Sequence, residues 1–327
     1  MFGVSVLKPR LDAGASDVCC PVRGCGYRVP LQPALFRTTA EYRCPLHRIY
    51  VAASTFAYER EADNLLWTRE DDLALLNGGR RRGWDLGLAY ENSERAVTWN
   101  VFRWLEVSGV LPGLLEHVLG RAVATAHVIY WGYSPEREGV YMPLVRARNA
   151  FEEEDADATE PALLVDTDDA LILVDPRLVS GAETSQMPVG WERYERGGKG
   201  WSTGVFAGVI REVASDKGSF ELLKLWLLGS YMAELAGKAF VLLHMTPVWS
   251  GAPLLAKLQP QFVSGPAREA RSLTWEDTYE HVAAEYPGVR DAQAVLTYFR
   301  EKSAGYGADG RLRRAFAVPE LQSETTS

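Results

Sequence analysis

The sequence predicts an α/β fold with a mixed central sheet, a small cysteine-bearing N-terminal region and C-terminal helices. Three observations lead to this prediction. The chain has 327 residues, 47% of them apolar, which is enough for a large domain with appendages. All four cysteines fall between residues 19 and 44. Further along, segments with helical and strand-like periodicity follow in the order helix, strand, hairpin, helix, strand. We therefore expect three parts, at residues 1–58, 59–260 and 261–327.

The cysteines of the first part predict a structural metal site. Cys20 and Cys25 form one knuckle, Cys44 and His47 form a second, and 18 residues separate Cys25 from Cys44. Thiolates and a neutral imidazole suit Zn²⁺, and two such knuckles are typical of structural zinc sites. Four protein ligands leave no open position, so the expected role is folding stability. Cys19 could replace Cys20 as a ligand, and four unrelated buried thiols remain the alternative interpretation.

The chain is expected to be a cytoplasmic protein with reduced cysteines. Residues 1–7 lack the basic start of a secretory signal, and clustered cysteines in a reducing compartment favour metal over disulfide. The most apolar stretch, residues 220–245, is interrupted by Glu221, Lys224, Glu234 and Lys238. It therefore predicts a buried helix and strand, and no membrane span.

Helices are predicted from apolar residues that recur at three- and four-residue intervals. Residues 59–77 show this spacing and end at Gly78-Gly79. In residues 91–106 the apolar face comprises Val97, Val101, Trp104 and Leu105. Further helices are expected at residues 111–119, 220–236, 274–286 and 290–303.

Strands are predicted at residues 123–133 and 239–243, and a hairpin at residues 162–165 and 170–174. The turn of this hairpin is Asp166-Thr-Asp-Asp169, which is rich in turn-forming residues. His244 lies among apolar residues, so we expect a core or interface residue there rather than a ligand. Residues 181–218 are rich in Gly and polar residues, so we expect mostly loop there, and a disordered tail after Pro319.

The resulting order, αβββαβ, is the minimal core of the PD-(D/E)XK nucleases, and parts of the hairpin resemble their motif. Glu160-Pro161-Ala162 stands where a Pro-Asp is expected, and Asp175-Pro176-Arg177 stands where an acid-x-Lys is expected. The chain is similar, over roughly residues 19–246, to a bacterial family that pairs a zinc knuckle with this nuclease fold. The stretches that carry this resemblance are residues 44–51, 91–103 and 222–229.

The resemblance implies a site for Mg²⁺ or Mn²⁺ that hydrolyses phosphodiester bonds, because carboxylates hold such ions and the ion activates water. Asp175 would be one ligand, and Glu91 or Glu94 would complete the set from the helix. The sequence departs from the motif twice. Ala162 lacks the expected carboxylate, and Arg177 stays protonated, so it cannot act as a base.

Each of these residues also has a structural interpretation. Glu91 and Glu94 fit a helix start, where acids interact favourably with the helix dipole. Asp175 and Arg177 fit a strand end followed by a surface charge. Since the net charge is −8, DNA would need a local basic patch. A candidate patch is the run Arg80, Arg81 and Arg82 with Trp84, whose basic residues could bind phosphate and whose aromatic ring could stack on a base. More often such a run forms a solvated loop.

Three functions are compatible with the sequence. The first is a metal-dependent DNA nuclease with an impaired motif, in defence against foreign DNA. The second is an inactive DNA-binding or scaffolding subunit with protein partners in a defence complex; homo-oligomers fit either. The third is an interaction module without nucleic acid, favoured by the acidic loop at residues 152–157 and the negative net charge.

Overall fold

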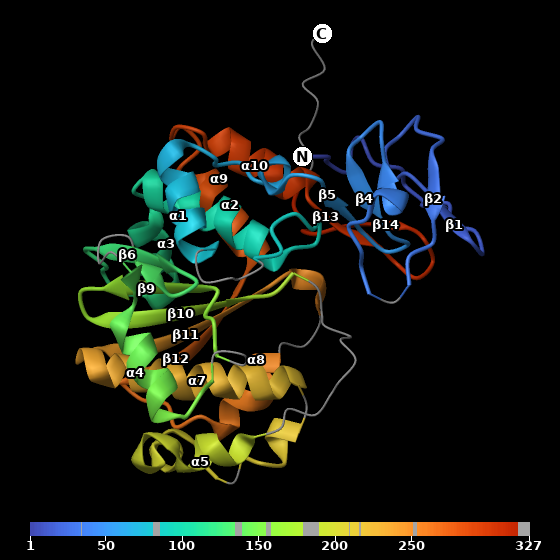
Figure 1. Cartoon of the computed structure of the whole chain (residues 1–327). Helices are drawn as coiled ribbons and strands as arrows, with labels where there is room; N and C mark the ends of the chain where they lie inside the picture. Colours follow the sequence, from blue (N-terminus) through green and yellow to red (C-terminus); the bar gives the residue numbers. More distant parts are fainter. Residues whose placement is uncertain are drawn as a thin grey trace.

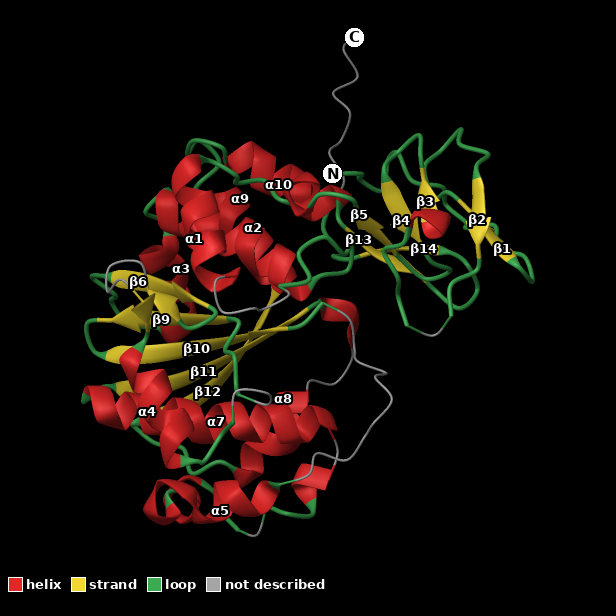
Figure 2. Ribbon diagram, viewed as in Figure 1, coloured by secondary structure: helices red, strands yellow, loops and turns green. Residues whose placement is uncertain are grey.

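The computed structural model describes residues 1–33, 35–80, 86–134, 139–154, 158–178, 190–208, 210–215, 217–250 and 254–319. It consists of an α/β body, in which a sheet lies between two layers of helices, and a smaller β-rich part beside it (Figure 1). The colouring by secondary structure in Figure 2 makes the three layers of the body clear. The predicted mixed α/β fold is confirmed.

The central sheet contains seven strands in the order β12-β11-β10-β9-β6-β7-β8. Strands β6, β9 and β10 pair antiparallel, whereas β10, β11 and β12 pair parallel. The strands are β6 (Ala126–Tyr130), β7 (Tyr133–Ser134), β8 (Gly139–Val140), β9 (Leu163–Thr167), β10 (Ala170–Pro176), β11 (Ala239–Thr246) and β12 (Arg268–Thr274).

The expected αβββαβ order is present in this sheet, with insertions. Helix α2 (Glu94–Val107) precedes β6, the hairpin β9–β10 follows, and α7 (Lys217–Ala236) connects β10 to its parallel neighbour β11. A parallel pair requires such a crossover connection. The insertions are α3 (Leu111–Leu119), the strands β7 and β8, α4 (Met142–Ala150), α5 (Trp191–Gly200) and α6 (Ser202–Val205).

Alternating side chains of the sheet contribute to two separate apolar cores. Ile172 and Val174 of β10 belong to the core shared with α2 and α3, whereas Leu171 and Leu173 belong to the core shared with α7. This period of two is the pattern of a sheet covered on both faces. The first layer also contains α1 (Glu70–Arg80), α9 (Trp275–Glu285) and α10 (Ala292–Glu301), and the second α8 (Leu254–Leu258) (Figure 1).

Several predicted boundaries are wrong. The single helix expected at residues 59–77 is a 3₁₀ turn, Glu61–Asn64, followed by α1. Helix α2 begins at Glu94 rather than Glu91, because the Ser93 hydroxyl caps it by accepting from the Ala96 N–H. The loop expected at residues 181–218 contains α5 and α6, whose Trp191, Tyr194 and Val205 are buried in the second core. The expected tail after Pro319 lies outside the described residues.

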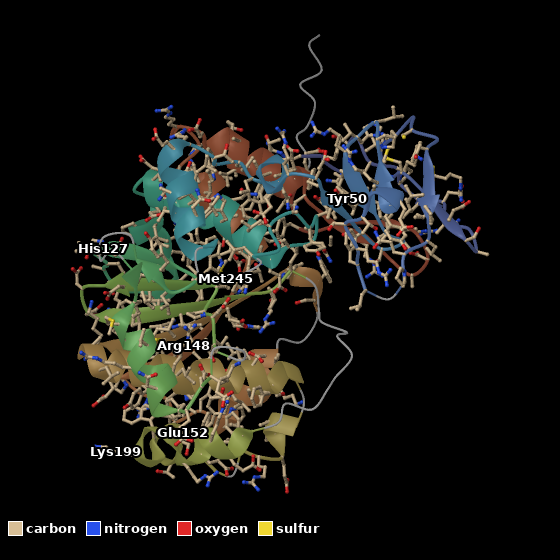
Figure 3. All side chains as sticks on the ribbon, viewed as in Figure 1. Tyr50, His127, Arg148, Glu152, Lys199 and Met245 are labelled. Carbon is tan, nitrogen blue, oxygen red and sulfur yellow. The ribbon has the colours of Figure 1, made fainter. Side chains whose placement is uncertain are left out.

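The cysteine module, as we call residues 1–58, has its own small core. It contains the hairpin β1–β2, the three-stranded sheet β3–β4–β5, and the buried Leu7 and Leu11, so the N-terminal segment packs against the module. Its strands are β1 (Asp17–Cys19), β2 (Arg28–Pro30), β3 (Arg43–Cys44), β4 (Ile49–Val51) and β5 (Phe56–Tyr58). A C-terminal hairpin, β13 (Ser303–Tyr306) with β14 (Leu312–Arg314), packs here through Tyr306 and Leu312. Figure 3 shows Tyr50 in this module and Met245 in the sheet of the body.

Candidate functional site

Two tight turns of the cysteine module bring four metal-binding side chains together. Cys20 directly follows β1, and Gly24, at φ +75°, turns the chain back so that Cys25 approaches it. Positive φ is a conformation that glycine adopts readily. Cys44 ends β3, and His47 lies in the turn that leads to β4. The ligand atoms of these four residues all lie within 4.8 Å of one another.

The distances within this group match a tetrahedral metal site. The Sγ atoms of Cys25 and Cys44 are 3.9 Å apart, and Nδ1 of His47 lies 3.5 Å from Sγ of Cys20 and 3.6 Å from Sγ of Cys44. Zinc–sulfur bonds of about 2.3 Å in a tetrahedron place two sulfurs about 3.8 Å apart. Burial raises the pKa of the Cys20 thiol well above its usual range, which disfavours the thiolate. A bound cation has the opposite effect, because it stabilises the thiolate. The predicted set is confirmed as a group that could hold a metal ion such as zinc.

Cys19 lies outside this group. Nζ of Lys8 contacts its sulfur at 2.9 Å and donates to the backbone carbonyls of Cys20 and Cys25 at 2.8 and 2.7 Å. Lys8 therefore bridges both ends of the first knuckle, and it is Cys20, not Cys19, whose thiol joins the ligand group.

Four of the residues predicted for the nuclease-like site converge at the end of β10. Leu163 pairs with Val174, so Ala162 and Asp175 are the next positions on the two neighbouring strands. Glu94, in the first turn of α2, accepts a hydrogen bond of 2.9 Å from the backbone N–H of Leu178. Arg177 is fixed through its backbone, whose N–H donates to the carbonyl of Met245 at 2.7 Å. We call Glu94, Ala162, Asp175, Arg177 and His244 the Asp175 site.

Both oxygens of the Asp175 carboxylate have basic partners. Nη2 of Arg177 lies 3.0 Å from Oδ1, and Nδ1 of His244 lies 2.8 Å from Oδ2. The residue is 5% exposed. Burial alone would raise the pKa of Asp175, but Arg177 and His244 together lower it below its ordinary value. The ionised form of Asp175 is therefore favoured, and its charge is balanced by protein groups.

His244 is a member of the site that sequence reasoning misses, since its apolar surroundings indicate a core residue. The parallel register of β10 and β11 places His244 beside Asp175. The sequence does show that His244 lies near the end of a predicted strand. It does not show that this strand pairs with β10, because residues 175 and 244 are far apart in the sequence.

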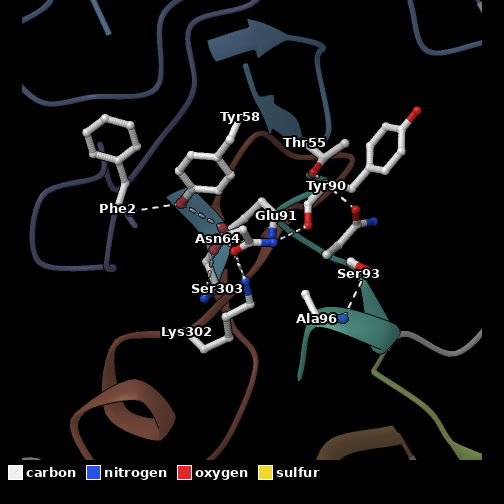
Figure 4. A network of polar contacts seen from close by, with 12 residues as sticks. Phe2, Thr55, Tyr58, Asn64, Tyr90, Glu91, Ser93, Ala96, Lys302 and Ser303 are labelled. Atoms are coloured by element: carbon white, nitrogen blue, oxygen red, sulfur yellow. Dashed lines mark hydrogen bonds and ion pairs between the residues drawn. The ribbon is translucent and has the colours of Figure 1, made fainter. Parts of the chain in front are cut away.

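Glu91 belongs to a different, fully buried set of contacts (Figure 4). Its carboxylate forms an ion pair of 3.2 Å with Lys302 and accepts hydrogen bonds from the hydroxyls of Tyr58, at 3.1 Å, and Ser303, at 2.9 Å. Glu91 thus connects the cysteine module to the segment after α10, whereas Glu94 is the acid that the fold brings to the Asp175 site.

The predicted basic patch and acidic loop lie largely outside the described residues. Arg80 is the last residue of α1, and Arg81, Arg82 and Trp84 lie outside the described residues. So does the centre of the acidic loop, residues 155–157. Within the described part of the chain, the cysteine–histidine group is the one cluster of three or more His, Cys, Asp or Glu that could hold a metal ion.

Comparisons with protein-family models, curated proteins and solved structures found no match to this chain. Among the described residues, no helix has the length and apolar character needed to cross a membrane.

Proposed function

We propose that the chain is a nuclease-like DNA-binding protein whose Asp175 site contacts phosphate but does not hydrolyse phosphodiester bonds efficiently. The observation that carries this proposal is the ion pair between Asp175 and Arg177, supplemented by His244. A carboxylate whose two oxygens already have cationic or hydrogen-bonding partners is a poor ligand for Mg²⁺ or Mn²⁺, which require free oxygens at octahedral positions.

Arg177 is the residue through which this site would contact DNA. Its side chain is 35% exposed, and its Nε and Nη2 face Asp175. Since a guanidinium has five N–H donors, donors remain for a phosphate oxygen. Arg95, one position along α2 from Glu94, is 32% exposed and pairs with Glu160 at 3.2 Å. It supplies a second cation near the start of β9.

The proposal includes a structural Zn²⁺ bound by Cys20, Cys25, Cys44 and His47. The near-tetrahedral distances support it, together with the borderline-soft donor set that zinc prefers. All four positions would be filled by protein, so the ion would stabilise the cysteine module and take no part in catalysis.

The test combines binding and cleavage on the same protein. Binding of labelled DNA is measured by fluorescence anisotropy without added divalent ions; EDTA is omitted because it competes for zinc. Cleavage is measured on plasmid DNA with Mg²⁺ or Mn²⁺. We expect binding without cleavage, and weaker binding by Arg177→Ala. Absence of DNA binding at low salt would refute the proposal.

A metal-dependent nuclease is the second candidate, favoured by the convergence of Glu94, Ala162, Asp175 and Arg177 at one strand end. It predicts that the wild-type chain cuts plasmid with Mn²⁺ and that Asp175→Asn abolishes cutting. Cleavage of this kind would show that the chain is a nuclease, and the proposal of DNA binding without efficient hydrolysis would be rejected.

A further inference from the structure

The cysteine module and the C-terminal hairpin are basic although the chain as a whole is acidic. Residues 1–58 contain seven Lys and Arg against three Asp and Glu, and residues 303–319 contain three Arg against one Asp. These two segments therefore carry a net charge of about +6, whereas the whole chain carries −8. They lie near opposite ends of the sequence, and only the fold combines them.

The contacts between the two segments place their arginines side by side. Arg10 and Arg311 are partners in an antiparallel bridge, and the N–H of Leu312 donates to the carbonyl of Pro9 at 2.9 Å. Leu312 packs against the core of the module. Since side chains alternate along a strand, Arg311 and Arg313 both face away from that core, and both are exposed.

Arg10 lines a groove of about 480 Å³, and Arg311 and Arg313 follow the hairpin turn that forms one of its walls. Its lining includes Arg10, Ala13, Ser54 and the turn of the C-terminal hairpin, Gly307-Ala-Asp-Gly310. A Cβ atom at Gly307 would lie 2.7 Å from Nε of Arg313, and one at Gly310 would lie 3.9 Å from Nε of Arg10. The Arg313 guanidinium therefore lies over Gly307, where Oδ1 of Asp309 would be 2.8 Å from the same Cβ, and the Arg10 side chain lies near Gly310.

Only part of the charge in this region is neutralised by acids. Arg28 pairs with Asp12 and Asp17, and Arg43 and Arg48 pair with Glu59. In the groove itself, Asp309 lies 3.7 Å from Arg311 and is the one acid in the lining. No acidic partner of Arg10 or Arg313 occurs among the described residues. Arg10 lines the groove, and Arg311 and Arg313 flank its hairpin turn, which carries the single carboxylate of Asp309. The surface around the groove therefore has a net positive charge.

We propose that this surface, the arginine groove, binds the phosphate backbone of a nucleic acid. The inference rests on the proposed DNA-binding function and names the surface responsible for most of the affinity. Arg311 and Arg313 are about 6.6 Å apart along the strand, which is close to the rise of two nucleotides at about 3.4 Å each. The hairpin is anchored to the body at its other end: after β14, the carbonyl of Ala315 accepts from Nε1 of Trp249, in the turn that follows β11.

The test removes two groove charges and compares them with two charges elsewhere. Arg10→Ala/Arg313→Ala is compared with Arg146→Ala/Arg290→Ala, which has the same net charge; Arg146 is exposed on α4 and Arg290 is 84% exposed. Anisotropy is measured for single-stranded DNA, double-stranded DNA and single-stranded RNA at several salt concentrations. Zinc content and circular dichroism establish that each variant is folded, as expected for exposed substitutions.

We expect the groove variant to bind roughly tenfold or more weakly at low salt, and the slope of log K against log salt to fall by about 2. The control variant should match the wild type. If the groove variant binds as tightly as the wild type and Arg177→Ala does not bind, this inference is overturned and the proposed function stands. No binding by the wild type would overturn both. If the wild type binds an oligoglutamate probe as tightly as nucleic acid, the inference of a nucleic-acid site is overturned in favour of an acidic protein partner.

Discussion

The Glu91–Lys302 ion pair lies where the body meets the cysteine module, whose Tyr58 donates to Glu91, and the substitution Lys302→Met measures what the pair contributes. Both side chains are 0% exposed, and their charged atoms are 3.2 Å apart. Burial lowers the pKa of Lys302, and Glu91 offsets part of this effect. Methionine retains most of the aliphatic volume of lysine but leaves the Glu91 carboxylate buried without a cation.

Removing one partner of a buried ion pair costs about 3 to 5 kcal/mol of the free energy of unfolding. We expect the lower end, about 3 kcal/mol, because Glu91 keeps the hydrogen bonds from Tyr58 and Ser303. The double variant Glu91→Gln/Lys302→Met removes both charges, so its loss should be about 1 kcal/mol or less. The coupling between the two positions is the loss of the double variant minus the summed losses of the two single variants, so Glu91→Gln is measured as well.

Urea unfolding, followed by tryptophan fluorescence and by circular dichroism, gives the free energies for the wild type, both single variants and the double variant. Coincident transitions by the two probes are required before the values are compared. Two results would refute the reasoning: a Lys302→Met loss below about 1 kcal/mol, or a double variant less stable than the Lys302→Met single variant.

Three further predictions concern the metal group and the Asp175 site. Cys19→Ser should keep the same zinc content per chain as the wild type, measured by atomic absorption, whereas Cys20→Ser should lose it; equal loss in both would contradict the assignment of Cys20. The pKa of Asp175 is lowered, so its stabilisation is complete above the ordinary value of about 3.9 and is lost only as pH falls through the folded-state value. The difference in urea midpoint between the His244→Gln variant and the His244→Gln/Asp175→Asn double variant should be constant from about pH 8 to about pH 5.5 if Arg177 alone keeps the pKa of Asp175 low, and a decrease within that range would show that His244 is required. Finally, Ala162→Asp should melt at a temperature that Mg²⁺ raises more than it does for Ala162→Asn, because a second carboxylate beside Asp175 creates a partial cation site; equal responses would show that the two positions do not face a common ion.

The elements predicted best from the sequence are those whose signal is local. The ligands Cys20, Cys25, Cys44 and His47 follow from spacing alone, and β9, β10 and β11 follow from short runs of aliphatic residues. Strand β12 is not predicted because it is polar: it lies at the sheet edge, carries Arg268, Glu269 and Arg271, and is only partly buried. The sheet therefore extends past the boundary expected at residue 260. Helix α5 is not predicted because Gly197, Gly198 and Gly200 suggest a loop, whereas Trp191 and Tyr194 stabilise it by burial.

What the sequence could not predict depends on contacts between distant segments. His244 contacts Asp175 through strand pairing, Lys302 reaches Glu91 from close to the other end of the chain, and the C-terminal hairpin completes the cysteine module. None of these pairs has a spacing that local periodicity could reveal, because each depends on how the sheet and the module are assembled.

Ala162 and Arg177, at the end of the β9–β10 pair, are consistent with each other in terms of charge. A buried cluster of two acids needs a divalent cation to be stable, since the repulsion and desolvation of two carboxylates are otherwise uncompensated. With alanine at position 162, one carboxylate remains at this pair of positions, and a single guanidinium balances it. Asp175 raises the pKa of Arg177 above its ordinary value, and the guanidinium contacts both oxygens of Asp175. Arginine is better suited to this position than lysine, because a lysine could lose its proton on burial and leave Asp175 unpaired. Alanine at position 162 and arginine at position 177 thus leave the Asp175 charge balanced, and the guanidinium keeps N–H donors for the phosphate contact that we propose.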